Sequence, residues 1–228
     1  MLALLLVRTH HLSGFTILVF CALIPSVILH EVSHGLVALS FGDDTARRAG
    51  RLTLNPARHV DPFGTILLPA ILALSGAGVF GWAKPVPVNP SRLRHPRNEN
   101  VVVALVGPAV NVTLAVVFGL AYRLLIPASD KFTPGGFFIP VSAQPTWVEF
   151  VFAVGYVNVI LAVFNLIPLP PLDGSAVVER ILPARLLPGY YRIRPFTIFL
   201  PLIVVLVFPG VLNRIFDPAL NWWSRLLG

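Results

Sequence analysis

Two histidines and a glutamate lie inside an otherwise apolar stretch, residues 28–36, with the sequence ILHEVSHGL. Residues four apart lie on one face of a helix, so His30 and His34 can present two imidazole nitrogens to a single metal ion. Glu31, one residue along, can then reach a water molecule held by that ion. The spacing predicts a zinc site suited to hydrolysis, although the same string also arises by chance on the wet faces of soluble helices.

Asp173 is the candidate for a third ligand, near the end of the stretch NLIPLPPLDG at residues 165–174. A catalytic zinc usually has three protein ligands and one position open to water, and a carboxylate from elsewhere in the chain is a common third. Ionisable groups inside a membrane cost about 3 kcal/mol or more each, so they usually mark function and have a partner. Glu31 is the one acidic residue well inside an apolar span, and Asp173 closes another.

The elements that must hold these residues are membrane helices. The chain has 228 residues, of which 56% are hydrophobic and 12% are charged, which is typical of a membrane protein rather than a soluble domain. About 20 apolar residues cross the hydrocarbon core. Such stretches occur at 14–41, 101–126, 147–169 and 193–212, and a fifth at 63–83 is debatable.

Basic residues predict the topology. Twelve of the 17 lysines and arginines fall in three loops, 47–58, 84–97 and 180–194, and the positive-inside rule places all three loops in the cytoplasm. A full crossing by 63–83 would separate the first two loops, so a re-entrant hairpin entered from the cytoplasm is the preferred interpretation. The basic residues form no single patch interleaved with aromatic side chains, so we expect no nucleic-acid partner.

The fold expected is a single all-α polytopic membrane domain, residues 1–228. It has about four full transmembrane helices, a re-entrant hairpin and short strands near the active site. At about 1.5 Å per residue, His30 lies roughly 24 Å along its helix from Gly14, toward the cytoplasmic side. Prolines 168, 170 and 171 break the third span and can turn Asp173 back toward the histidines. The C-terminal stretch PALNWWSRLLG has the aromatic and basic mix of a short helix on the membrane surface.

Three motifs in this order resemble those of the site-2 proteases, a family of intramembrane zinc metalloproteases. They are HEVSH at 30–34, GPAVN at 107–111 and NLIPLPPLDG at 165–174, and the resemblance covers roughly residues 14–175. The resemblance implies that His30, His34 and Asp173 hold one zinc ion and that Glu31 is the catalytic base and acid. It also implies a transmembrane protein or peptide substrate that is cut within or near the bilayer.

The same resemblance gives roles to Asn111 and Asn165, which match motif asparagines that help position substrate or stabilise the reacting carbonyl. From the residues alone, Asn111 is as easily an interhelical hydrogen bonder, and Gly107 and Pro108 are helix-packing and kink residues. The family is found in membranes, and we expect a multi-pass protein in contact with lipid, in the plasma membrane of a prokaryote. Its active site would face the cytoplasmic side, and no oligomeric state is predicted.

Two loops raise further questions. The stretch WAKPVPVNP, residues 82–90, is extended by its prolines and can add a strand to a substrate, with a plain loop as the alternative. The stretch 50–64 contains His59 and Asp61, which we interpret as parts of turns or of a short strand pair rather than as metal ligands. Asn55-Pro56 and Asp61-Pro62 are the turn signals.

Two other functions compete with proteolysis. A zinc-handling transporter or sensor would use the same three ligands, but a carrier has no need of a base beside the first ligand, so Glu31 argues against it. A catalytically silent helix bundle that binds partner proteins would be expected to have lost part of the set formed by His30, Glu31, His34 and Asp173.

Overall fold

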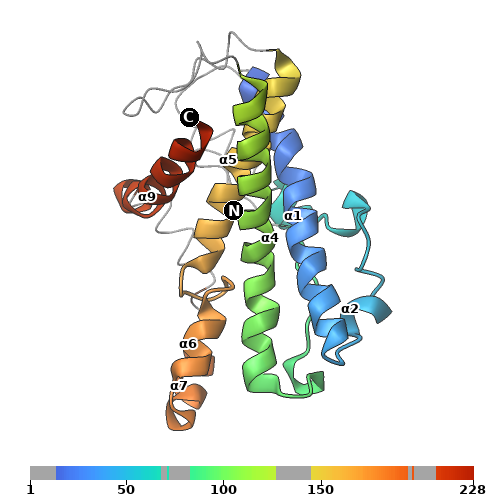
Figure 1. Cartoon of the computed structure of the whole chain (residues 1–228). Helices are drawn as coiled ribbons and strands as arrows, with labels where there is room; N and C mark the ends of the chain where they lie inside the picture. The colour runs from blue at the N-terminus through green and yellow to red at the C-terminus, as the bar shows by residue number, and fades with distance from the viewer. Residues whose placement is uncertain (1–13, 68–70, 72–82, 127–144, 195–196, 198–208) are drawn as a thin grey trace.

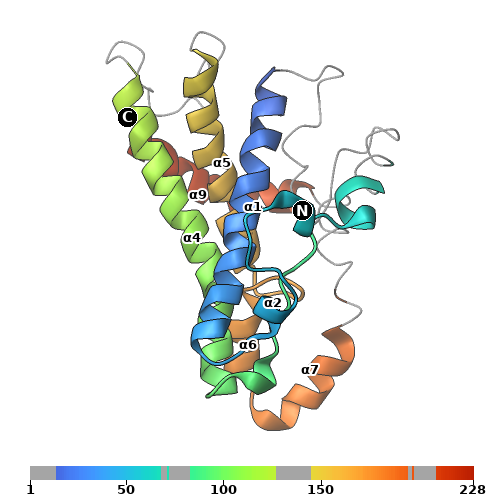
Figure 2. The same cartoon turned by 90° about the vertical axis from the view of Figure 1, so that its right-hand side faces the viewer.

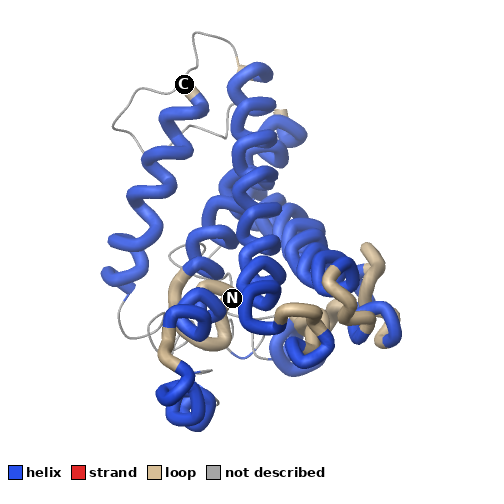
Figure 3. The backbone as a smooth tube through the Cα atoms, turned by 60° about the horizontal axis from the view of Figure 1, so that its bottom comes forward, coloured by secondary structure: helices blue, strands red, loops and turns tan. Residues whose placement is uncertain are grey.

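Three long helices form the body of the protein. The computed structural model describes residues 14–67, 71, 83–126, 145–194, 197 and 209–228, and every regular element in them is helical (Figure 3). Helices α1 (Gly14–Ser40), α4 (Pro96–Leu125) and α5 (Thr146–Leu166) pack side by side (Figure 1). Each is long and apolar enough to cross a membrane. The chain is therefore a multi-pass membrane protein.

Three of the predicted spans correspond to these helices. The ranges 14–41, 101–126 and 147–169 coincide with α1, with all but the first turn of α4, and with α5 together with the turn after it. The fourth span, 193–212, and the debatable stretch 63–83 lie mostly outside the described residues. The fourth crossing and the re-entrant hairpin therefore stay predictions.

Local sequence explains where the long helices begin and end. Gly42 follows α1 with a φ of 106°, which favours glycine, and the Asp43 N–H reaches back 2.9 Å to the Ala38 carbonyl to close the helix end. Helix α4 begins at Pro96, where the missing N–H costs nothing, and Glu99 accepts a hydrogen bond from the His95 N–H at 2.9 Å.

Most of the short helical elements gather at the end of the bundle where α1 ends and α4 begins, whereas the one formed by residues 62–67 lies nearer the middle of α1 (Figure 2). They follow from turn signals in the loops, such as Asn55 accepting from the Ala57 N–H at 3.0 Å, which confirms the turn predicted there. The elements are α2 (Thr45–Arg48), η2 (Pro56–Arg58), η3 (Pro62–Leu67), η4 (Pro90–Arg92), α6 (Ser175–Ile181), η7 (Ala184–Leu186) and α7 (Leu187–Ile193). A longer helix, α9 (Pro209–Leu227), lies against α4 and α5 away from these elements (Figure 1).

The short strands expected near the active site are not found in the described residues. Residues 84–89 are extended, but their N–H groups are not paired with a neighbouring strand. The Val86 N–H donates to the Glu31 carboxylate at 2.8 Å, and the Asn89 N–H donates to the Asp43 carboxylate at 2.6 Å. Side chains from α1 and the turn after it have taken the place of a strand partner.

Candidate metal centre

His30 and His34 lie one turn apart on the face of α1 that meets α4. Both are buried, and their Nε2 atoms are 3.1 Å apart. Gly107 of α4 lies directly against them, because a Cβ built there would be 2.5 Å from His34 Nε2 and 2.6 Å from His30 Cε1. The packing glycine of the second motif therefore lets α4 approach the two rings closely.

Asp173 is brought to the histidines by the turn that follows α5. Its Oδ2 atom lies 3.1 Å from His30 Nε2 and 3.4 Å from His34 Nε2. The next residue, Gly174, donates its N–H to the Asn165 carbonyl at 2.7 Å. A Cβ on Gly174 would collide with the carbonyl oxygens of the last turn of α5, so only glycine allows the chain to fold back this tightly.

The three side chains fit a divalent zinc ion. A tetrahedral zinc with bonds of about 2.0–2.2 Å has neighbouring donor atoms about 3.3–3.6 Å apart, close to the 3.1, 3.1 and 3.4 Å found here. Asp173 Oδ2 is also buried without a hydrogen-bond donor among the described residues. His30, His34 and Asp173 form the one such cluster of histidine, cysteine and acidic residues in the described part of the chain.

Both imidazoles are backed by hydrogen-bond acceptors. His34 Nδ1 lies 2.6 Å from the Val103 carbonyl oxygen, which can only accept, so this nitrogen carries the proton. His30 Nδ1 lies 2.6 Å from the side-chain oxygen of Asn111. An acceptor behind each ring is typical of histidines that bind metal, because it leaves the Nε2 lone pair free for the ion.

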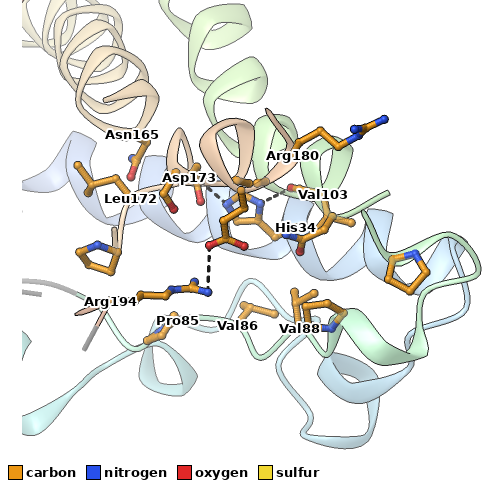
Figure 4. A pocket seen from close by; sticks show the side chains of 18 of the residues that line it. His34, Pro85, Val86, Val88, Val103, Asn165, Leu172, Asp173, Arg180 and Arg194 are labelled. Carbon is orange, nitrogen blue, oxygen red and sulfur yellow. Dashed lines mark hydrogen bonds and ion pairs between the residues drawn. The ribbon is translucent and has the colours of Figure 1, made fainter. Parts of the chain in front are cut away.

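Glu31 lies on the wall of an open pocket of about 760 Å³ that also contains the three candidate ligands. The extended segment 84–89 forms the opposite wall, where Pro85, Val86 and Val88 face His34 and Asp173 (Figure 4). The Val86 N–H holds one oxygen of Glu31 at 2.8 Å. A carboxylate, three candidate zinc ligands and an extended backbone thus meet in one cavity.

The two motif asparagines occupy different places. Asn165 lines the pocket, and its amide donates to the Leu161 carbonyl one turn earlier at 3.0 Å. Asn111 has no exposed surface and lies behind His30. Its NH2 group donates to Asn158 of α5 at 2.7 Å, so both ends of the amide are occupied.

Arginines at the edge of the pocket were not indicated by any sequence motif beyond the general excess of basic residues. Arg97 donates to the Leu182 carbonyl at 2.6 Å, and Arg180 donates to the Asn98 side chain at 2.8 Å, which ties α6 to the start of α4. Arg194 pairs with Glu179 at 3.1 Å (Figure 4). The buried Asn158 and Ser26 also carried no sequence signal.

His59 lies away from the metal cluster. It is buried, its Nε2 atom is 2.9 Å from the Thr53 carbonyl oxygen, and its own carbonyl accepts from the Lys84 N–H at 2.9 Å. Asp61 accepts from the Gly64 N–H at 2.7 Å in the turn predicted at Asp61-Pro62. The contact between the His59 carbonyl and the Lys84 N–H holds the loop to the start of the extended wall of the pocket, while the other two contacts are local to the loop.

Comparison with known proteins identifies the family. The sequence model of peptidase family M50 matches residues 137–208. YwhC of Bacillus subtilis, named as a zinc metalloprotease, is 42% identical over 162 residues, which are 71% of this chain and 67% of the relative. Rip2 of Mycolicibacterium smegmatis, named likewise, is 32% identical over 217 residues, 94% of this chain and 76% of the relative.

A more distant relative is MJ0611 of Methanocaldococcus jannaschii, also named as a zinc metalloprotease, which is 29% identical over 170 residues, 73% of each chain. No solved structure matches the chain. The identity with YwhC and Rip2 extends over most of each protein. The chain therefore belongs to peptidase family M50, the site-2 protease family, and is a zinc metalloendopeptidase.

Proposed function

We propose that this metalloendopeptidase is an intramembrane protease that hydrolyses peptide bonds of transmembrane-helix substrates in regulated intramembrane proteolysis. His30, His34 and Asp173 hold a single zinc ion, and Glu31 is the general base and acid. The observation that carries the proposal is the convergence of three donor atoms within 4.8 Å of one another, beside a carboxylate, in a bundle of membrane-crossing helices.

Each polar residue of the pocket has a separate role in the proposed hydrolysis. Zinc, when bound, supplies a Lewis acid and lowers the pKa of bound water toward about 7. Glu31 takes a proton from the attacking water and delivers it to the departing amine nitrogen. Asn165 offers a polar group to the substrate in the pocket, whereas Asn111, whose amide is committed to His30 and Asn158, contributes through His30.

The matched substitution Glu31→Gln tests the role of the base. Glutamine keeps the shape and can still accept from the Val86 N–H, but it cannot take a proton, so cleavage should fall by at least about 100-fold. Zinc content should stay at the wild-type level. Both are measured on purified full-length protein in detergent, with a generic transmembrane peptide as substrate. Retained proteolysis in this variant would contradict the assignment.

The same experiment separates the protease from a zinc transporter or sensor. His34→Ala removes a proposed ligand, so it should lose both zinc and cleavage, and a zinc chelator should abolish wild-type cleavage. A wild-type protein that binds zinc at the three residues but cleaves no transmembrane peptide would favour the transporter or sensor. Comparative proteomics of wild-type and Glu31→Gln cells then identifies physiological substrates as membrane proteins that accumulate in the mutant.

The extended wall of the pocket is proposed to hold the substrate. A helical substrate must be unwound before its peptide bonds can be attacked, and an extended segment can pair with the unwound strand. The N–H groups of Val86 and Asn89 are already taken by Glu31 and Asp43, whereas the Val88 N–H has no partner among the described residues and is left for the substrate.

Val88→Pro tests this pairing, because it removes one backbone N–H from the wall, while Val88→Ala keeps it. The proline variant should lower kcat/KM up to about tenfold, the value of one lost hydrogen bond, with little change in zinc affinity. Equal losses of cleavage and zinc affinity in Val88→Pro would count against a role in substrate binding.

We further propose that the site opens toward the cytoplasm in a prokaryotic plasma membrane. The basic residues of α2, η4, α6 and α7 lie at the end of the bundle that carries the site (Figure 2). Lysine and arginine favour the cytoplasmic face. The relatives are bacterial and archaeal, which supports a prokaryotic membrane.

A further inference from the structure

A buried row of polar side chains leads from the metal centre into the middle of the bundle, with one member from each long helix. Asn111 of α4, Asn158 of α5 and Ser26 of α1 have at most 2% of their surface exposed. The Asn111 NH2 donates to Asn158 Oδ1 at 2.7 Å, and the Asn158 NH2 donates to Ser26 Oγ at 2.8 Å. The row ends behind His30, whose Nδ1 is 2.6 Å from Asn111 Oδ1.

The hydrogen bonds of the row can run in only one direction. At the end away from His30 they are accepted by two backbone carbonyl groups, which cannot donate. The Ser26 hydroxyl donates to the Ala22 carbonyl at 2.7 Å, so its oxygen accepts from Asn158. The Asn158 NH2 also donates to the Val154 carbonyl at 2.8 Å. The donor end of the Asn158 amide is thus fixed, and its oxygen must face Asn111.

The fixed orientation of the Asn158 amide also determines which nitrogen of His30 carries a proton. Since the Asn158 oxygen accepts from the Asn111 NH2, the Asn111 oxygen is the end presented to His30. An amide oxygen can only accept, so Nδ1 is the nitrogen of His30 that carries a proton. In the neutral ring the lone pair then lies on Nε2, the atom 3.1 Å from Asp173 Oδ2.

We propose that Asn158 is a positioning residue for the metal centre: it fixes the orientation of the Asn111 amide and thereby selects Nε2 of His30 as the atom that binds zinc. This inference rests on the proposed ligand set of His30, His34 and Asp173. Without Asn158 the Asn111 amide can rotate and present its NH2 to His30 Nδ1, which favours the ring form with a proton on Nε2. That form cannot bind the ion.

A plainer role would be to hold the three helices together, because hydrogen bonds between buried polar residues join membrane helices. The two roles differ in what they predict for a background in which residue 111 cannot be reversed. Asn111→Asp has an oxygen at both ends of the group, so an acceptor faces His30 whichever way it turns. If Asn158 only orients residue 111, it becomes unnecessary in the Asn111→Asp background. If Asn158 joins the helices, it is still needed in that background.

The experiment measures zinc affinity of the purified full-length protein by chelator competition for Asn158→Leu in both backgrounds. In the wild-type background the affinity should fall about 10-fold to 100-fold, the usual effect of losing a partner of a ligand histidine. In the Asn111→Asp background the same change should leave the affinity within about twofold or improve it. The visible spectrum of the Co²⁺-loaded protein provides a second readout, and it should change with Asn158→Leu only in the wild-type background.

Ser26→Ala is the matched control. It removes one hydrogen bond of the same row, but the Val154 carbonyl still fixes the Asn158 amide, so zinc affinity should stay within about twofold of wild type. Thermal unfolding of each metal-free variant reports the loss of packing separately. The proposal is overturned if Asn158→Leu lowers zinc affinity equally in both backgrounds, if Ser26→Ala matches its effect, or if only the thermal stability changes.

Failure of the underlying ligand set is distinguishable from failure of this proposal. His30→Ala should lose zinc if the ligand set is right. Zinc retained in His30→Ala would overturn the ligand set and this proposal together. Zinc lost in His30→Ala, combined with equal effects of Asn158→Leu in both backgrounds, would overturn the role of Asn158 alone.

Discussion

At the scale of single residues, two glycines decide how close the parts of the metal centre can come. Gly107 lets α4 touch both histidine rings, and Gly174 lets the chain turn back at the end of α5 so that Asp173 reaches them. Neither has a positive φ, so it is the missing side chain rather than the backbone conformation that is needed. The two glycines stand in motifs together with functional polar residues because the site requires this close approach.

Gly107→Ala should lower zinc affinity by at least about tenfold. The added methyl group would lie 2.5 Å from His34 Nε2, and the ring cannot move away without losing its hydrogen bond to Val103. Chelator competition measures the affinity. Gly210→Ala in α9 is the control, since a Cβ there meets no atom within 4 Å and should change nothing. An unchanged affinity in Gly107→Ala would show that the ligands do not depend on this contact.

At the scale of elements, the extended segment is held to α1 and the following turn by acceptor side chains. Glu31 accepts a hydrogen bond from the Val86 N–H. Asp43, which has no exposed surface, accepts one from the Asn89 N–H at 2.6 Å. Arg51 adds a hydrogen bond to the Lys84 carbonyl at 2.6 Å. The catalytic carboxylate and the proposed substrate-binding wall are therefore positioned by the same contacts.

Asp43→Asn should destabilise the protein by about 1–3 kcal/mol at pH 7, because an amide cannot accept all the hydrogen bonds that Asp43 accepts. Burial alone would raise the pKa of Asp43, but hydrogen bonds from Thr45 and the Asn89 N–H outweigh it and lower the pKa below 3.8. A lowered pKa stabilises the folded state above the unfolded value, and the stabilisation is lost as the pH falls through the folded pKa.

The stability difference between wild type and Asp43→Asn should therefore be constant near neutral pH and shrink below pH 3.8. Thermal unfolding in detergent at a series of pH values measures it. Asp44→Asn is the neighbouring control: this carboxylate is at the surface, paired with Arg48 and Arg92, and its loss should matter less. A difference that grows as the pH falls would contradict the assignment.

At the scale of the whole molecule, α9 closes the side of the bundle formed by α4 and α5. The C-terminal stretch is helical as predicted, but it is part of the longer helix α9, and its place on the membrane surface stays a prediction. The two neighbouring tryptophans of this helix point in different directions. Trp223 is 2% exposed and donates to the Ala115 carbonyl at 2.8 Å, whereas Trp222 is 55% exposed. Trp223 fills a notch between Gly119 and Gly155, where a Cβ on Gly155 would lie 2.5 Å from its ring.

The adjacent tryptophans provide a matched pair for testing this docking. Trp223→Ala should lower the free energy of unfolding by about 3–5 kcal/mol, while Trp222→Ala should stay within about 0.5 kcal/mol of wild type. No described residue that lines the metal pocket belongs to α9, so zinc affinity should be unchanged in both variants. Loss of zinc with Trp223→Ala would show that α9 is coupled to the site.

Much of the candidate site follows from local spacing in the sequence. The four-residue separation of His30 and His34 places both on one face of any helix, and prolines must end the helix before Asp173. The basic loops and long apolar stretches predict membrane helices and their order. These features need only the chain itself, because helical periodicity and the membrane thickness act on local sequence.

The tertiary structure alone decided which helix faces meet. Helices α1 and α5 are apolar around most of their circumference, so no amphipathic pattern predicts how they are rotated about their axes. That rotation brings Asn111 behind His30, aligns Asn158 with Ser26, and places Glu31 against Val86. These contacts join residues between 55 and 132 positions apart, and the packing of the three helices and of the extended segment, rather than any local preference, selects them.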